Sequence, residues 1–188
     1  VLEVIASEGA ETANSPADSV KNVDFIFTML PSGKEVYQAA FGDQGFAQSM
    51  SKNTLLIDTS TNLPADTDEI SEKLATRQCR MIDAPVGRLA QNAIEGTLLF
   101  MVGGSKSDLE SARPLLNLLG DKIVHCGRPV GMGSRMKIVN NYQSTALNVL
   151  TAETLTLAEA SGLDINLAIE VMRETTAGRG HMNATYPN

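Results

Sequence analysis

Residues 131–144 read GMGSRMKIVNNYQS, a turn with two glycines that leads into a long helical sequence. Segments typical of strands alternate with segments typical of helices before this stretch, whereas only helical segments follow it. Alternation of this kind predicts βαβ units around a parallel sheet, and helices without strands predict a second, all-helical domain. We therefore expect one domain over residues 1–133. Residues 134–188 should form a long interdomain helix and the start of the helical domain.

Five short apolar runs that end in polar residues or are followed by Pro or Gly predict the strands. They are Val23–Leu30, Leu55–Ser60, Met81–Val86, Leu98–Val102 and Lys122–Cys126. Helical patterns with suitable start and stop residues predict helices over residues 1–8, 16–20, 34–40, 64–75, 107–119, 134–161 and 165–173. The predicted fold class is α/β: a Rossmann-like parallel sheet whose first βα unit is missing, followed by the start of an all-α domain.

Lys137 lies near the start of the long predicted helix, for which Ser134 is the expected N-cap. No side chain from Ile138 to Ala152 is charged, so we expect much of this helix to be buried. Burial and the positive end of the helix dipole both disfavour a cation, which predicts a lowered pKa for Lys137 and suits a general acid–base group. Asn141 lies one turn later on the same face. The alternative is a lysine whose stem lies on apolar surface while its ammonium group reaches water.

The composition is that of an ordinary globular protein, with 188 residues of which 43% are hydrophobic and 20% charged. A net charge of −7 without basic runs argues against nucleic-acid binding, and no apolar run is long enough to span a membrane. Cys79 and Cys126 are far apart and are expected to be reduced, and His125 and His181 lack partners at metal-ligand spacing. We therefore expect a cytoplasmic protein without a metal site. The start has no signal-peptide pattern and no Met, so we expect it to lie within a longer protein.

The pattern Gly-x-Gly-x-x-x-Lys-x-x-Asn-Asn at residues 131–141 resembles the catalytic segment of the β-hydroxyacid dehydrogenase family, which includes 3-hydroxyisobutyrate dehydrogenase and tartronate semialdehyde reductase. The resemblance runs along essentially the whole chain. It implies a homo-oligomeric oxidoreductase that uses NAD, with NADP as the alternative, on a small anionic aldehyde or hydroxyacid. In this family the motif lysine, here Lys137, is the acid–base group, and Asn141 is expected to act beside it. The resemblance implies that the rest of this stretch lines the substrate pocket, through Asn140, Asn141, Tyr142 and Ser144.

Loops and polar residues follow the predicted strands, where ligands bind in open parallel sheets. The resemblance assigns the loop Met29-Leu30-Pro31 to the dinucleotide, and it assigns Thr61, in the segment Asp-x-Ser-Thr, to the nicotinamide ribose. Without the resemblance these would be only a loop start and a polar turn. The family's Gly-x-Gly-x-x-Gly loop is not in the chain and is expected upstream of Val1, so residues 1–133 would form a partial dinucleotide-binding domain.

Asp-Ala-Pro-Val at residues 83–86 is followed by Gly87 and Arg88, where most family members have Ser-Gly-Gly to hold a substrate carboxylate. This difference, with similar segments at residues 92–98 and 176–188, resembles a branch of the family that reduces 3-sulfolactaldehyde in sulfoquinovose degradation. A guanidinium with five N–H groups suits the three oxygens of a sulfonate, and it also binds carboxylates. Two alternatives remain open. One is a carboxylated substrate such as tartronate semialdehyde or 3-hydroxyisobutyrate, and the other is a catalytically silent binding module.

Overall fold

The computed structural model describes residues 2–175 and residue 177. The chain forms two compact units, Val1–Val139 and Asn140–Asn188, and a single long helix continues from the first into the second. The predicted domain boundary after residue 133 stays a prediction. The similar segment noted at residues 176–188 lies outside the described residues, apart from Ala177.

The order of strands and helices follows the predicted α/β pattern closely. The strands are β1 (Phe25–Thr28), β2 (Leu55–Asp58), β3 (Arg80–Asp83), β4 (Val86–Gly87), β5 (Leu98–Gly103) and β6 (Gly120–Gly127). The helices are α1 (Leu2–Ser7), α2 (Pro16–Ser19), α3 (Gly33–Phe41), the 3-10 helix η1 (Phe46–Gln48), α4 (Pro64–Thr76), α5 (Ala90–Ile94), α6 (Lys106–Leu119), α7 (Met132–Ala160) and α8 (Ile165–Glu174). The short elements β4, α5 and η1 are those that the sequence did not predict.

The sheet of the first unit has the parallel pairs expected of a Rossmann-like fold, together with antiparallel pairs that the sequence did not predict. β1, β2 and β3 are parallel neighbours, and β6 is parallel to β5. β5, however, is antiparallel to both β3 and β4. The reason is the connection between β3 and β5, which contains only β4 and the five-residue α5. Such a segment does not provide the long crossover helix that usually joins parallel strands.

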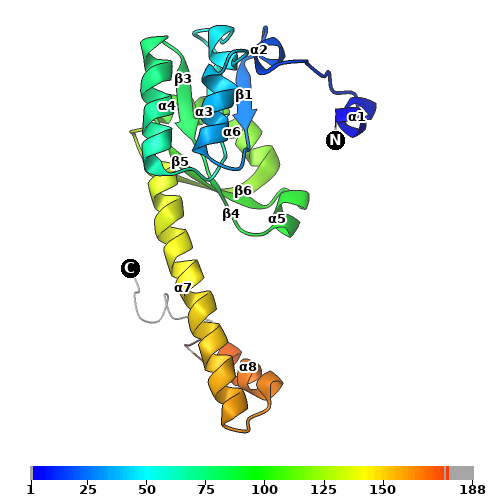
Figure 1. The fold of residues 1–188 in the computed structure, drawn as a ribbon, viewed down its shortest axis with the longest axis vertical. Coiled ribbons are helices and arrows are strands. Elements are labelled where there is room, and N and C mark those ends of the chain that lie inside the picture. The colour runs from blue at the N-terminus through cyan, green and yellow to red at the C-terminus, as the bar shows by residue number, and fades with distance from the viewer. Residues whose placement is uncertain (1, 176, 178–188) are drawn as a thin grey trace. The chain divides into compact units, whose positions relative to one another are not determined.

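Helices cover both faces of this sheet, as Figure 1 shows. Side chains alternate across a strand, so Leu55 and Ile57 of β2 face one way and Leu56 faces the other. Leu56 packs in a core with residues of α3 and α4. Leu55 and Ile57 pack in a second core with residues of α6. All three β2 side chains are fully buried, and burying each contributes about 1.5–3 kcal/mol.

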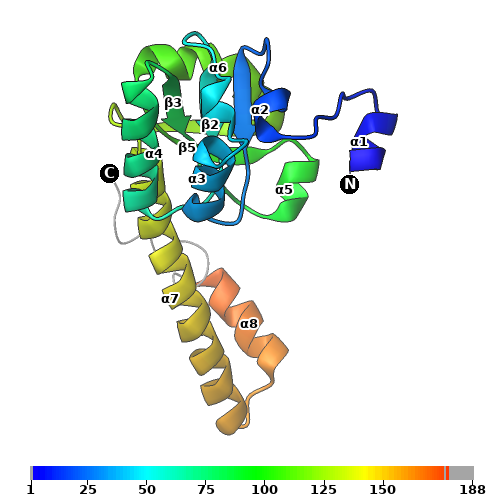
Figure 2. The same cartoon turned by 45° about the horizontal axis from the view of Figure 1, so that its top comes forward.

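The uncharged part of α7 is exposed along much of its length, so the prediction that it is largely buried is wrong for the described chain. Val139, Tyr142 and Leu150 are 67%, 79% and 58% exposed. An uncharged sequence supplies apolar surface, but burial also needs a partner, and no part of the chain that the structure describes covers these side chains. Within the second unit α8 runs back alongside the end of α7 (Figure 2). Large exposed apolar surfaces are typical of sites that pack against further protein.

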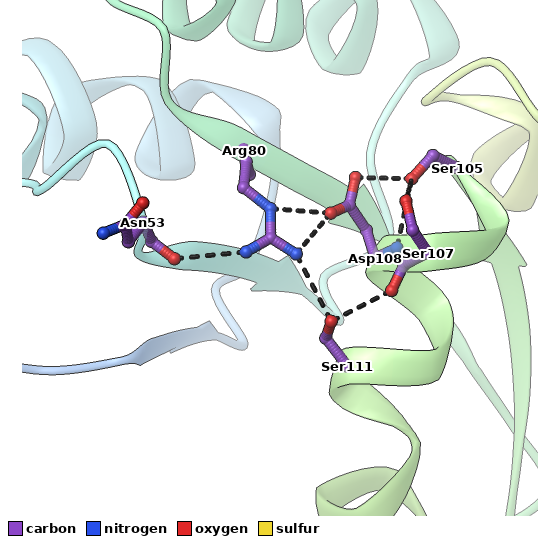
Figure 3. Close-up of polar contacts among 6 residues, drawn as sticks. All are labelled: Asn53, Arg80, Ser105, Ser107, Asp108 and Ser111. Carbon is purple, nitrogen blue, oxygen red and sulfur yellow. Dashed lines mark hydrogen bonds and ion pairs between the residues drawn. The ribbon is translucent and has the colours of Figure 1, made fainter.

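A polar cluster holds the amino end of β3 against α6 (Figure 3). Arg80 Nε donates to Asp108 Oδ1 at 2.7 Å, and Arg80 Nη1 donates to the carbonyl oxygen of Asn53 at 3.2 Å. Asp108 Oδ2 in turn accepts a hydrogen bond of 2.7 Å from Ser105 Oγ, at the start of α6. Because this cluster lies at the amino ends of the parallel strands, it is opposite the edge where ligands bind in such sheets. We interpret it as a structural cluster.

The described residues contain neither a membrane-spanning helix nor a cluster that could hold a metal ion, and they show the state of the cysteines and of His125. None of the described helices is both long and apolar enough to cross a membrane. Over residues 2–175 and 177, no group of three or more His, Cys, Asp or Glu side chains could hold a metal ion. Cys79 and Cys126 are free and half-buried, and burial raises the pKa of both thiols. A ring nitrogen of His125 is paired with the carbonyl oxygen of Gly104 at 2.9 Å, and His181 lies outside the described residues.

Candidate active site

The carboxyl ends of β1, β2 and β3 meet at one edge of the sheet, where Thr28, Asp58 and Asp83 are in register. Asp58 is buried at this edge, with 1% of the residue exposed, and its carboxylate accepts hydrogen bonds from neighbouring segments. Its Oδ1 accepts a hydrogen bond from Thr28 Oγ1 at 2.9 Å, and its Oδ2 accepts one from Asn62 Nδ2 at 2.6 Å. The carboxylate of Asp58 therefore ties the end of β1 to the loop after β2.

The four predicted cofactor residues lie on the loops that follow β1 and β2. The N–H of Leu30 donates to Ser60 Oγ at 2.9 Å, which joins the two loops directly. Leu30 is half-buried, whereas Met29, Pro31 and Thr61 are exposed. The structure thus brings these residues to the edge that the sequence indicated, and their contact with a dinucleotide stays a prediction.

Asp83, at the end of β3, holds the start of α7. Its Oδ1 accepts a hydrogen bond from the N–H of Gly131, and its Oδ2 accepts one from the N–H of Ser134, both at 2.6 Å. The prediction that Ser134 is the N-cap is wrong, because α7 begins at Met132 and the buried carboxylate satisfies its free N–H groups instead. Burial raises the pKa of the Asp83 carboxyl, while the hydrogen bonds from Ser134 and Gly131 lower it. Asp83 therefore fixes the first turn of α7 at the end of β3.

Replacing Asp83 with alanine is expected to destabilise the intact protein by about 1–3 kcal/mol, because buried N–H groups of Gly131 and Ser134 lose their acceptor. Urea unfolding of the two proteins measures this difference. Asp24→Ala is the matched control, since Asp24 is exposed, and its free energy of unfolding should stay within about 0.5 kcal/mol of wild type. Equal stability of Asp83→Ala and wild type would show that Asp83 does not hold α7.

Lys137 lies in the second turn of α7, within the first unit. Its Nζ donates to the carbonyl oxygen of Val86 in β4 at 2.8 Å, and the side chain is half-buried. Burial lowers the pKa of the Lys137 ammonium below its ordinary value of 10.5. The predicted direction of this pKa shift is confirmed, and burial is its cause.

A groove of about 590 Å³ lies beyond the carboxyl ends of β1 and β2, bounded by β4, α5 and the start of β5. Its wall includes Val86, whose carbonyl oxygen accepts the hydrogen bond from Lys137. Two predicted site residues, Met29 and Arg88, also line it. The complete lining is Phe27, Met29, Thr59, Val86, Arg88, Leu89, Ala90, Ala93, Leu98, Phe100 and Leu119. The groove is therefore largely apolar, with one cationic side chain in its wall.

Gly87 and Arg88 have different environments although they are adjacent. Gly87 is buried and pairs with Leu99 of β5, whereas Arg88 is exposed. Arg88 has a φ of 77°, in the left-handed region that non-glycine residues rarely adopt. Its Nη1 donates to Asp121 Oδ1 at 2.7 Å and to the carbonyl oxygen of Thr97. The sequence did not indicate Asp121, because nothing in the local pattern connects two residues that are 33 positions apart.

The other predicted residues lie on α7 within the second unit. Asn141, one turn after Lys137 on the same helix, is half-buried. The side chains of Asn140, Tyr142 and Ser144 are exposed. Their roles in catalysis or substrate binding stay predictions.

Comparison with known proteins gives matches along nearly the whole chain. Residues 1–127 match the family model described as the NAD binding domain of 6-phosphogluconate dehydrogenase. The chain is 42% identical to the 3-sulfolactaldehyde reductase of Escherichia coli (strain K12) over 184 residues, which are 98% of this chain and 61% of that protein. It is 34% identical to the NAD-dependent L-serine dehydrogenase of Pseudomonas aeruginosa over 186 residues, or 99% of this chain and 62% of that protein.

A solved structure of the 3-hydroxyisobutyrate dehydrogenase of Mycobacterium tuberculosis with L-serine is also similar. It matches with a TM-score of 0.82 and 32% sequence identity, and the match covers 97% of this chain and 60% of that chain. The present chain thus spans about three fifths of the length of the curated relatives named above.

Proposed function

Because the chain belongs to the β-hydroxyacid dehydrogenase family, with an NAD-binding domain of the 6-phosphogluconate dehydrogenase type, we propose that the intact protein reduces 3-sulfolactaldehyde to 2,3-dihydroxypropane-1-sulfonate. The observation that carries this proposal is the hydrogen bond from Lys137 Nζ to the carbonyl oxygen of Val86. It holds an amine whose pKa is lowered by burial beside the segment that contains Gly87 and Arg88. Reduction of a small anionic aldehyde needs both a proton donor and a group that binds the anion.

Lys137 is the proton donor in this proposal. As hydride reaches the aldehyde carbon, the C=O π electrons move to oxygen, and Nζ–H transfers its proton to that oxygen. The amine that remains is neutral, and burial favours the neutral form. Asp83 keeps Lys137 in place by holding the start of α7. Asn141 acts beside Lys137, and the remaining pocket residues are Asn140, Tyr142 and Ser144.

The cofactor in the proposal is NAD, with NADP as the alternative, and when bound it supplies the hydride. Met29, Leu30, Pro31 and Thr61 would hold it at the carboxyl edge of the sheet. One observation supports a ligand there. Asn62 Oδ1 is buried and has no hydrogen-bond partner among the described residues, so it is an acceptor available to a donor group of a ligand.

Gly87 and Arg88 favour a sulfonated substrate over a carboxylated one. A permanently charged guanidinium in the wall of an apolar groove attracts an anion, and its planar set of N–H groups can contact more than one oxygen of a sulfonate. The carboxylated alternative, tartronate semialdehyde or 3-hydroxyisobutyrate, is supported by relatives such as the 3-hydroxyisobutyrate dehydrogenase of Pseudomonas aeruginosa, which is 34% identical.

We also propose a cytoplasmic homo-oligomer, and the exposed apolar side chains of α7 support the association of subunits.

The decisive experiment is a substrate panel with the intact protein. We expect a higher kcat/KM for 3-sulfolactaldehyde than for tartronate semialdehyde, measured by cofactor absorbance with NADH and with NADPH. Equal values for the two aldehydes would reject the sulfonated substrate and leave the family activity. Turnover of no substrate in the panel, including 3-hydroxyisobutyrate in the reverse direction, would instead favour the silent binding module.

A further inference from the structure

The contacts of Arg88 show how its side chain is held before any ligand binds. Asp121, the second residue of β6, accepts a hydrogen bond of 2.7 Å from Arg88 Nη1. The carbonyl oxygen of Thr97, just before β5, accepts from the same nitrogen. Both partners therefore lie at the amino ends of neighbouring parallel strands, β5 and β6, and they hold the guanidinium through Nη1.

This arrangement leaves much of the guanidinium available. Over residues 2–175 and 177, no acceptor contacts Arg88 Nε or Nη2, and Arg88 lines the groove. A guanidinium presents five N–H groups in a plane, so a contact through Nη1 does not prevent binding of an anion through the other two nitrogens. The left-handed backbone conformation of Arg88 also supports a ligand site here. Such strained conformations persist where the surroundings hold a residue firmly, often at ligand sites.

We propose that Asp121 is a positioning residue that orders the Arg88 guanidinium for an anionic substrate and thereby contributes to substrate specificity. This inference rests on the proposed function. A long side chain loses rotamer entropy when it binds a ligand, and a contact that already orders it reduces this cost. Asp121 does not line the groove, so it acts through Arg88 and not on the substrate.

The test compares Asp121→Asn, which removes the charge but keeps the size, with wild type in the intact protein. The substrates are 3-sulfolactaldehyde and glyceraldehyde, a neutral aldehyde of related size. We expect KM for the sulfonated aldehyde to rise about two- to fivefold, the range for loss of an exposed ion pair, with kcat and the kinetics of glyceraldehyde unchanged. Glu110→Gln is the matched control, because it breaks an exposed ion pair with Arg113 within α6 and should alter neither substrate.

A double-mutant cycle with Arg88→Ala shows whether Asp121 acts through Arg88. In the Arg88→Ala background, Asp121→Asn should have no further effect on KM for the sulfonated aldehyde. If Asp121→Asn still raises KM for the sulfonated aldehyde in the Arg88→Ala background, the inference is overturned. It is also overturned if Asp121→Asn alone leaves this KM unchanged or lowers it. A lowered KM would mean that Asp121 competes with the substrate for Arg88. If Arg88→Ala instead changes KM equally for the two aldehydes, or for neither, the assignment of Arg88 under the proposed function fails as well, which separates that outcome from failure of Asp121 alone.

Discussion

Replacing Lys137 with alanine in the intact protein is expected to lower kcat for aldehyde reduction about 100- to 10,000-fold, the usual contribution of a general acid–base group. The loss follows from the absence of a proton donor at the nascent alkoxide. Affinity for the cofactor should change little, because Lys137 contacts Val86 and none of the four predicted cofactor residues. Steady-state kinetics and a fluorescence titration with NADH measure the two quantities. Lys106→Ala, at an exposed lysine at the start of α6, is the matched control and should keep wild-type kcat.

The pH profile and Lys137→Arg together test whether Lys137 transfers a proton or acts only through its charge. Reduction needs the protonated amine, so activity should be present below the pKa of Lys137 and should fall as the pH rises through it. Burial lowers that pKa, so the fall should begin below the ordinary value of 10.5. Lys137→Arg keeps the charge but does not release its proton, and it should lose activity as alanine does. If the arginine variant, or the alanine variant, retains near wild-type kcat, Lys137 is not the acid.

Much of the fold follows from local sequence patterns. Apolar runs such as Leu55–Ser60 predicted the strands, and the carboxyl edge they share predicted where Met29 and Thr61 lie. The direction of β5 could not be predicted this way, because it depends on the length of the connection and on pairing with distant strands. The exposure of α7 could not be predicted from the sequence either. Composition shows how apolar a helix is, but it does not show what covers the helix.

Some residues of the candidate site could be predicted from the sequence and others could not. Lys137 and Arg88 lie in recognisable motifs, whereas the residues that position them do not. Asp83 is 51 positions from Ser134, and Asp121 is 33 positions from Arg88, so only the folded chain brings each pair together. Aspartate is common at strand ends and turns, and its identity alone does not show whether it caps a helix or orders an arginine.

Arg88→Ala is expected to reduce kcat/KM for 3-sulfolactaldehyde about 10- to 150-fold. This range corresponds to loss of a charge-assisted hydrogen bond of roughly 1.5–3 kcal/mol, at about 1.4 kcal/mol for each factor of ten. A neutral aldehyde makes no such bond, so its kcat/KM should change little. Specificity is a ratio of kcat/KM values, and both substrates must therefore be measured with both proteins.

Two further variants test whether the guanidinium or the backbone is responsible. Alanine at a φ of 77° keeps the strain of a left-handed conformation, about 1–2 kcal/mol, whereas glycine relieves it. If the guanidinium binds the sulfonate, Arg88→Gly should lose as much specificity as Arg88→Ala although it is the more stable of the two. Recovery of specificity in the glycine variant would mean that a rearrangement of the loop in the alanine variant, and not the lost charge, caused the effect. Replacing Gly87-Arg88-Leu89 with Ser-Gly-Gly should move the preference towards carboxylated aldehydes, because serine and backbone N–H groups would then replace the cation as the anion-binding group.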